Sequence, residues 1–249
     1  MGLSLGLGAS SSSYTSEYLP TEISGLAVWL STDTLNTLDI VDSTTREVQK
    51  WTNRADSNYD FKFIGTNRGP IADAARTEIV FTGTTNGDSL IAKDAGGNTV
   101  AGAELSYGDG YTICIIATNE GLDSESVFAG SAIGANSALI FFDAETLRFR
   151  TQDGSTYNFE TDSLNDDTYV SYIIVVNDSG SNNATLFINN TEASTLTVDG
   201  DFNFGQLGGN NGNSLNNSFT RMKQVIVYTK ALNQAERNAL YTNYIAPAI

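Results

Sequence analysis

Apolar and polar residues alternate along the chain from Ile23 onward, and this period of two is typical of β-strands that bury one face. Residues 111–118 are instead β-branched, aromatic or apolar at nearly every position, which predicts a central strand with Cys114 as a small buried hydrophobe. Further strands are predicted at residues 23–30, 50–52, 78–81, 139–142, 147–150, 169–176, 184–189 and 224–229. Many short strands separated by turn residues predict an all-β fold, an antiparallel sandwich or jelly roll.

Polar connections between these segments predict how neighbouring strands pair. Residues 143–146 form a four-residue connection, and residues 177–183 form a longer polar loop, so each is expected to close a hairpin. The glycine-rich residues 207–212 lack the Lys-Ser/Thr pair of a phosphate-binding loop and do not lead into a helix. They therefore predict a turn between strands.

One short helix is predicted at the C-terminal end. Asn233 and Glu236 have the spacing of a capping box, in which each side chain bonds to a free backbone N–H of the first turn. Pro247 ends the pattern. The apolar stripe consists of Leu232, Ala235, Ala239, Leu240 and Tyr244.

The N-terminal segment differs from the rest of the chain. Residues 1–17 are a low-complexity stretch of Gly, Leu and Ser that cannot bury enough apolar surface to order itself. Leu3, Leu5 and Leu7 alternate with small residues, so the segment could pair as a strand with another chain. The sequence does not distinguish a frayed terminus from an anchoring arm. We divide the chain into an arm, residues 1–20, and one domain, residues 21–249, a length that one all-β domain can reach.

The composition excludes several partners and several types of catalytic site. The chain carries 29 acidic and 13 basic residues, a net charge of −16, with no histidine and one cysteine. This charge repels phosphate groups, so neither nucleic acid nor an anionic membrane is an expected partner. Without histidine there is no Ser-His-Asp or Cys-His catalysis, and one cysteine forms neither an internal disulfide nor a zinc cluster. No secretory signal and no membrane-spanning apolar run are expected.

Four segments, taken in order, resemble laminin-G-like, concanavalin A-like jelly-roll domains. Residues 23–30 with 48–53 are similar to the family's "GLA-x-WL … V-x-x-W-x-(D/N)" entry, and residues 78–83 to its strand ending in Phe-x-Gly. Residues 168–190 are similar to its hairpin "W-x-x-(V/I)-x-V-V … L-(Y/F)-(V/I)-N-G", and 219–237 to its ending "Y-x-x-A-L-S-x-A-E-R". Departures are Tyr169 for Trp, Asn190 for Gly and Gln224 for Glu. The resemblance implies an antiparallel concanavalin A-like jelly roll that buries Trp29 and Trp51, and it implies no catalytic residues.

The whole chain also resembles virion structural proteins of tailed bacteriophages. It starts Met-Gly-Leu-Ser-Leu-Gly-Leu-Gly and carries a single jelly roll. This resemblance implies a non-enzymatic protein of the virion: a capsid decoration, a head fibre or a tail-associated protein. Its expected partners are other virion proteins and further copies of itself, contacted through Leu3, Leu5 and Leu7. This is the first functional hypothesis.

A lectin-like module that binds host-surface glycans is the alternative. A sugar stacks on an exposed aromatic ring beside polar hydrogen-bonding groups. Tyr107, Tyr111 and Tyr157 lie near predicted loops, and Asn210 and Asn211 could line a rim.

Calcium could assist such binding, because Ca²⁺ takes six to eight oxygen ligands. The oxygen-rich candidates are Asp39 with Asp42, the group Asp162, Asp166 and Asp167, and residues 199–201. No other cofactor is expected.

A glycoside hydrolase is the third hypothesis. Retaining glycosidases need two carboxyl groups about 5 Å apart, which on a strand requires acids at alternate positions. The nearest match is Glu120, Asp123 and Glu125, where the first spacing is three and Gly121 intervenes. These acids are expected in a loop, and the chain is predicted not to be an enzyme.

Overall fold

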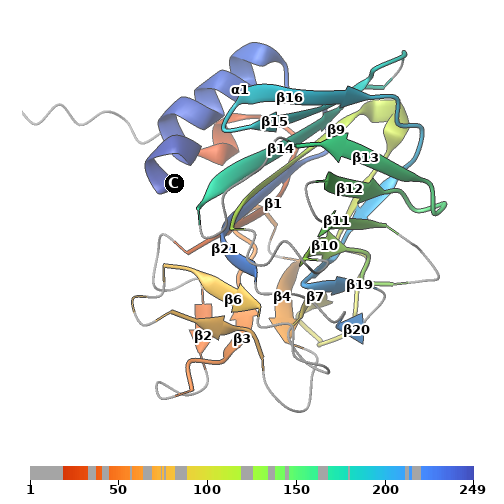
Figure 1. The fold of residues 1–249 in the computed structure, drawn as a ribbon. Coiled ribbons are helices and arrows are strands. Elements are labelled where there is room, and N and C mark those ends of the chain that lie inside the picture. The colour runs from red at the N-terminus through yellow and green to blue at the C-terminus, as the bar shows by residue number, and fades with distance from the viewer. Residues whose placement is uncertain are drawn as a thin grey trace, which may run out of the picture.

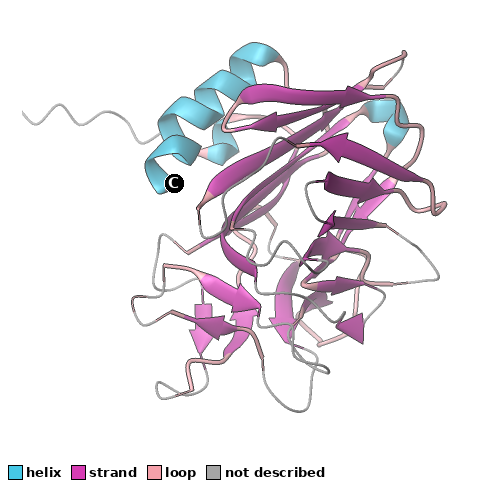
Figure 2. Cartoon of the chain, in the orientation of Figure 1, coloured by secondary structure: helices cyan, strands magenta, loops and turns pink. Residues whose placement is uncertain are grey.

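Two large antiparallel sheets lie face to face around the main hydrophobic core (Figures 1 and 2). The computed structural model describes residues 19–32, 38–40, 45–56, 58–63, 69–73, 75, 77–81, 89–118, 126–133, 138–143, 146–161, 168–178, 180–210, 213–214 and 220–249. The first sheet runs, in spatial order, through β16 (Thr191–Leu196), β15 (Ala184–Ile188), β14 (Val170–Val176), β9 (Tyr111–Ala117), β21 (Thr220–Tyr228), β6 (Ile79–Phe81) and β5 (Ile71–Ala72), and β1 (Leu26–Ser31) also pairs with β21.

The second sheet and two short ribbons complete the β-structure described. The second sheet runs through β13 (Thr156–Glu160), β12 (Thr146–Arg150), β11 (Leu139–Asp143), β10 (Ser126–Gly130), β18 (Gln206–Leu207), β7 (Leu90–Asp94), β4 (Tyr59–Phe63), β3 (Val48–Trp51) and β2 (Leu38–Ile40). The ribbons pair β8 (Ala103–Leu105) with β17 (Phe202–Phe204), and β19 (Gly209–Asn210) with β20 (Asn213–Ser214). The predicted all-β antiparallel jelly-roll sandwich is confirmed.

Strand β9 is apolar or aromatic at every position except Thr112, because both of its faces are covered. Ile113 and Ile115 point into the core between the sheets, whereas Cys114 and Ile116 point to a second cluster on the outer face of the first sheet. All seven residues of β9 are buried. The predicted central strand and the buried Cys114 are therefore confirmed, and burial raises the pKa of the Cys114 thiol.

The C-terminal helical segment covers that outer face. α1 (Gln234–Leu240) continues into a π-turn, η3 (Tyr241–Ile245), and a 3-10 turn, η4 (Ala246–Ala248). Figure 1 shows this segment lying outside the first sheet, and the side chains of Leu240, Tyr244 and Ile245 fill the second cluster. Trp29 is buried there and donates its indole N–H to the Tyr244 hydroxyl at 2.8 Å. Trp51 is fully buried in the core between the sheets.

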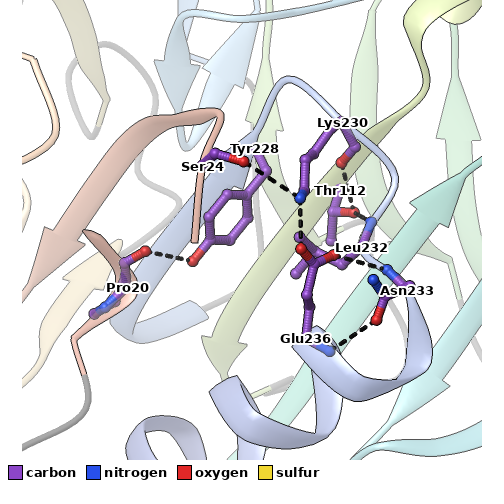
Figure 3. A network of polar contacts seen from close by, with 8 residues as sticks. All are labelled: Pro20, Ser24, Thr112, Tyr228, Lys230, Leu232, Asn233 and Glu236. Atoms are coloured by element: carbon purple, nitrogen blue, oxygen red, sulfur yellow. Dashed lines mark hydrogen bonds and ion pairs between the residues drawn. The ribbon is translucent and has the colours of Figure 1, made fainter. Parts of the chain in front are cut away.

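A network of polar contacts fixes the start of α1 (Figure 3). The Glu236 N–H donates to Asn233 Oδ1 at 3.0 Å, and the Asn233 N–H donates to Glu236 Oε2 at 3.1 Å, so the predicted capping box is confirmed. Lys230 pairs with Glu236 at 2.6 Å. This pairing, together with the bond from the Asn233 N–H, lowers the pKa of Glu236. Thr112 Oγ1 in β9 donates to the Lys230 carbonyl and accepts from the Leu232 N–H, which ties the helix to the sheet.

Both predicted hairpins are present, with β11 paired to β12 and β14 paired to β15. The predicted strand at 23–30 is shorter than expected: a 3-10 turn, η1 (Pro20–Glu22), precedes it and β1 begins at Leu26.

Residues 1–18, including Leu3, Leu5 and Leu7, lie outside the described residues, so the arm stays a prediction. None of the described helices combines the length and the apolar character that crossing a membrane requires.

Candidate functional site

The ribbon of β8 and β17 presents two polar side chains on its outer face. Phe202 and Phe204 are fully buried in the core, so Asn203 between them must point the other way. Asn203 lies directly opposite Glu104 in the antiparallel pairing. Cβ atoms of residues paired in this way lie about 4.5–5.5 Å apart. The two side chains therefore lie next to each other, Glu104 exposed and Asn203 almost completely covered.

Asn203 is the unusual member of this pair. Its side chain is only 6% exposed, and its Oδ1 atom has no hydrogen-bond partner. Burying an acceptor without a partner costs about 1–3 kcal/mol, so most buried polar atoms in proteins are paired. The Asn203 oxygen is therefore an unsatisfied acceptor enclosed beneath the surface, next to the cleft described below.

Asn203 lines an open cleft of about 590 Å³. The cleft is lined by Glu104, Leu105, Ser106, Ile133, Gln152, Asp201 and Asn203. Ile133 is 41% exposed, one of two large apolar side chains exposed in the described part of the chain. An apolar contact and several hydrogen-bonding groups thus lie around the same hollow.

A second cleft of about 450 Å³ adjoins the first. It is lined by Tyr107, Gly108, Gln152, Asp153, Asp199, Gly200 and Asp201. Because Gln152 and Asp201 line both clefts, the two clefts form one continuous surface feature. We call these two adjoining clefts the acidic groove.

Hydrogen bonds between distant segments hold the groove together. The Tyr107 N–H, at the start of η2 (Tyr107–Asp109), donates to Asp201 Oδ1 at 2.7 Å, and the Gln152 N–H donates to the Asp201 carbonyl at 3.0 Å. The Tyr111 hydroxyl donates to the Gly200 carbonyl at 3.2 Å. A Cβ atom on Gly200 would lie 2.6 Å from Thr151 Cβ, so the loop can approach this closely only with glycine there.

A buried amide fixes the base of the same loop. Asn183 Oδ1 accepts from the Val198 N–H at 2.9 Å, and its Nδ2 donates to the Val198 carbonyl at 2.8 Å. Asn183 is 3% exposed and also bonds the Asn177 carbonyl. These contacts position the backbone immediately before Asp199 and Asp201.

Hydrogen bonds within the groove hold Asp153 in its ionised form and engage Asp199. Asp153 accepts from Thr151 Oγ1 at 2.6 Å and from the N–H and hydroxyl of Ser155, and these bonds lower the pKa of Asp153. The Tyr157 hydroxyl donates to the Asp199 carboxylate. Partial burial, followed by this hydrogen bond, raises the pKa of Tyr157, so its hydroxyl stays protonated.

Negative charge dominates the groove as a whole. Glu104, Asp153, Asp199 and Asp201 line it, and the described lining residues include no Lys or Arg. A concave surface lined by one sign of charge concentrates the electrostatic potential and repels ligands of the same sign. The groove is therefore suited to ligands that bring hydrogen-bond donors and no negative charge.

The structure places two of the predicted glycan-binding residues at the groove and buries a third in the core. Tyr107 lines the groove, and Tyr157 bonds to Asp199 on its wall. The prediction for Tyr111 is wrong: it is fully buried, because this end of β9 is covered and its ring packs near Phe149. Asn210 pairs with Asn213 through the backbone of the ribbon β19–β20. The Asn210 side chain and the whole of Asn211 lie outside the described residues.

The calcium and hydrolase candidates fall mostly outside the described residues. This applies to Asp42, Asp162, Asp166, Asp167, Glu120, Asp123 and Glu125, and also to the side chain of Asp39, whose backbone lies in β2. In the described part of the chain, no group of three or more acidic, Cys or His side chains could hold a metal ion. Asp199 and Asp201 lie in the groove without forming such a group.

Sequence reasoning missed Glu104, Ile133, Gln152 and Asn203. Only Asn203 carries a local signal, since a polar residue between Phe202 and Phe204 indicates a strand with one buried face. The other three residues come from separate segments, and their position in one groove depends on the tertiary fold.

Comparison with known proteins agrees with the architecture. No protein-family model and no curated protein matches the chain. The binding domain of botulinum neurotoxin serotype D matches with a TM-score of 0.62 and 12% identity, covering 89% of this chain and 52% of that one. The binding domain of Paraclostridial Mosquitocidal Protein 1 matches with a TM-score of 0.55 and 17% identity, covering 88% and 52%.

A third match is the serotype D ligand binding domain in complex with N-acetylneuraminic acid, with a TM-score of 0.62 and 12% identity, covering 89% of this chain and 51% of that one. The chain thus spans about half the length of these solved structures. The matches establish a β-sandwich fold. At such low identity they carry no residue roles.

Proposed function

We propose that this chain is a non-enzymatic, surface-binding β-sandwich that recognises carbohydrate in the acidic groove. The observation that carries the proposal is a long polar groove, lined by Gln152 in both clefts, that is flanked by Ile133 and Tyr107. Sugars offer many hydroxyl donors together with apolar C–H faces, and this combination matches such a surface. The structural matches are binding domains, and one was solved with a bound sugar acid, which supports the same class of function.

The state of the carboxyl groups also supports binding over hydrolysis. A glycosidase needs one carboxylic acid with a raised pKa to protonate the leaving oxygen. In the acidic groove, the hydrogen bonds from Thr151 and Ser155 lower the pKa of the Asp153 carboxyl group. Carboxylates held in the ionised form accept hydrogen bonds from a ligand but do not supply that proton.

A glycan array followed by calorimetry on the best ligand tests the binding function. Gln152 lines both clefts, so Gln152→Ala is expected to weaken binding about fivefold, the loss of roughly one hydrogen bond. Gln234→Ala, an identical change on the exposed surface of α1, serves as the control and leaves the affinity unchanged. Absence of binding to any saccharide, or equal affinities for the two variants, would contradict the proposal.

The setting that we propose for this module is the virion of a tailed phage, with attachment through residues 1–20. Residues 1–16 carry no Asp, Glu, Lys or Arg in a chain of net charge −16. Copies this acidic repel one another, so assembly would have to use apolar or backbone contacts, which the segment with Leu3, Leu5 and Leu7 offers.

Deleting residues 1–17 is expected to abolish incorporation into particles while leaving the thermal unfolding of the jelly roll unchanged. Co-sedimentation of the tagged protein with phage particles measures incorporation. Triple replacement of Leu3, Leu5 and Leu7 by serine keeps the length and tests the apolar contacts alone. Normal incorporation of the deleted protein would refute attachment through the arm.

A further inference from the structure

The loop that follows β16 carries a chemically reactive pair of residues. Asp199 is followed by Gly200, and both residues line the acidic groove. In an Asp-Gly pair the backbone nitrogen of the glycine lies close to the side-chain carboxyl carbon, Cγ, and no Cβ atom shields it. Attack of this nitrogen on Cγ closes a five-membered succinimide ring. A Cβ atom at position 200 would lie 2.6 Å from Thr151 Cβ, so the fold itself requires the glycine.

The Gly200 N–H is unbonded, although the groups around it are held. The Gly200 carbonyl accepts from the Tyr111 hydroxyl at 3.2 Å, and Val198 is bonded through both its N–H and its carbonyl. Among the described residues, no acceptor bonds to the Gly200 N–H. Asp199 is exposed to water, and its carboxylate accepts from the Tyr157 hydroxyl. The attacking nitrogen at this position therefore has no hydrogen bond to break.

The two other Asp-Gly pairs of the chain, at 109–110 and 153–154, differ in this respect. The Gly110 N–H donates to the Tyr107 carbonyl at 3.2 Å, and the Gly154 N–H donates to the Thr151 carbonyl at 3.0 Å. The Asp153 carboxylate is also held by Thr151 Oγ1 at 2.6 Å. Attack by either nitrogen first requires its hydrogen bond to break, which corresponds to a factor of about five in rate.

We propose that Asp199 is a site of spontaneous isomerisation to isoaspartate, and that this modification releases the wall of the acidic groove. The Gly200 nitrogen bonds to Asp199 Cγ, and one carboxyl oxygen leaves as water with the amide proton and the carboxyl proton. Water then adds to the ring. Cleavage of the new N–Cγ bond restores aspartate, whereas cleavage of the bond from the nitrogen to the Asp199 backbone carbonyl carbon gives isoaspartate. Water is the only other reactant, and carbohydrate binding is not assumed.

Isoaspartate adds one carbon atom to the backbone of a loop that is fixed on both sides. On one side, the buried Asn183 amide holds the N–H and the carbonyl of Val198. On the other side, Asp201 accepts the Tyr107 N–H at 2.7 Å and the Gln152 N–H at 3.0 Å. Because the Asn183 contacts are buried, we expect the added length to displace the contacts of Asp201. These are the bonds that tie the loop to the rest of the groove.

Incubation of the full chain in neutral buffer, followed by peptide mapping, tests the site. Electron-transfer fragmentation distinguishes isoaspartate from aspartate in each Asp-Gly peptide. Isoaspartate is expected to accumulate about fivefold faster at Asp199 than at Asp109 or Asp153, the factor for one hydrogen bond. Equal accumulation at the three positions, or none at Asp199, overturns the proposal.

Incubation in a concentration of urea that unfolds the chain is the control for the fold. The three positions are then expected to isomerise at similar rates, because the hydrogen bonds that distinguish them are gone. A preference for Asp199 that persists in urea would come from the neighbouring sequence, and it would contradict the proposed cause.

Hydrogen exchange on the incubated protein tests the release of the groove wall. In the chromatographically separated isoaspartyl form, the amides of Tyr107 and Gln152 are expected to exchange about fivefold faster, the factor for one lost hydrogen bond. Asp199→Glu keeps the charge but cannot close the five-membered ring, so its amides are expected to stay protected on incubation. Asp109→Glu, the same change in another pair, should behave like the unchanged protein. Unchanged exchange in the isoaspartyl form, or faster exchange in incubated Asp199→Glu, overturns the release.

Discussion

Replacing Phe202 with alanine is expected to lower the free energy of unfolding by about 4 kcal/mol, within the range found when a fully buried aromatic ring is deleted. The Phe202 ring is stacked on Phe149 with centroids 5.0 Å apart and an interplanar angle of 19°, and Phe204 lies 6.4 Å away. All three rings are fully buried, so the deleted ring leaves a cavity between rigid neighbours. The loss of buried apolar surface and the cavity both lower the free energy of unfolding.

Urea unfolding followed by tryptophan fluorescence measures this loss as a lower midpoint at an unchanged slope. Phe202→Leu is the matched control, because it keeps most of the apolar volume and is expected to cost about 1–1.5 kcal/mol. Since Asn203 follows Phe202 in β17, the alanine variant should also weaken saccharide binding. A loss below about 1 kcal/mol for alanine would show that the stacked rings contribute little to the core.

Replacing Asn183 with leucine is expected to cost about 3 kcal/mol, although both side chains have four heavy atoms in the same branched arrangement. The substitution leaves both the N–H and the carbonyl of Val198 buried without a partner, and each such group costs about 1–3 kcal/mol. The loop that carries Asp199 and Asp201 follows directly, so the acidic groove should lose its fixed shape as well. We therefore expect stability and saccharide affinity to fall together.

Hydrogen exchange of the amides of residues 197–201, together with urea unfolding, measures both effects. Asn177→Ala is the control: Asn177 is exposed and bonds the Asn183 carbonyl with its side chain, so its loss is expected to cost less than about 1 kcal/mol. Unchanged exchange protection in the Asn183→Leu protein would mean that other contacts hold this loop.

The parts of the fold that were predictable are those with a strong local signal. Consecutive residues are enough to predict the apolar strand β9 and the hairpin of β14 and β15. The capping box of Asn233 and Glu236 is likewise a spacing of three residues. Strand β16 was not predicted, because its residues are mostly exposed and polar. It is defined instead by its pairing with β15. Local pattern is informative where the segment buries one face or both faces.

Tyr111 shows why the candidate site was harder to predict than the fold. As an aromatic residue beside loops, it met the sequence criterion for a sugar platform as well as Tyr107 did. The two differ only because this end of β9 is covered, where Tyr111 packs near Phe149 and bonds the Gly200 carbonyl. Which of two similar side chains stays accessible depends on segments far away in the chain.

The amino-acid sequence was enough to predict the all-β character of this protein, its central strand, its C-terminal helix and its strong negative charge. These properties follow from composition and from periods of two to four residues, which act over neighbouring positions. The position of Glu104, Gln152, Asp201 and Asn203 around one groove could not be predicted in this way. It depends on the pairing of β8 with β17 across about a hundred residues of chain, and this long-range pairing also leaves Asn203 buried with an unsatisfied oxygen.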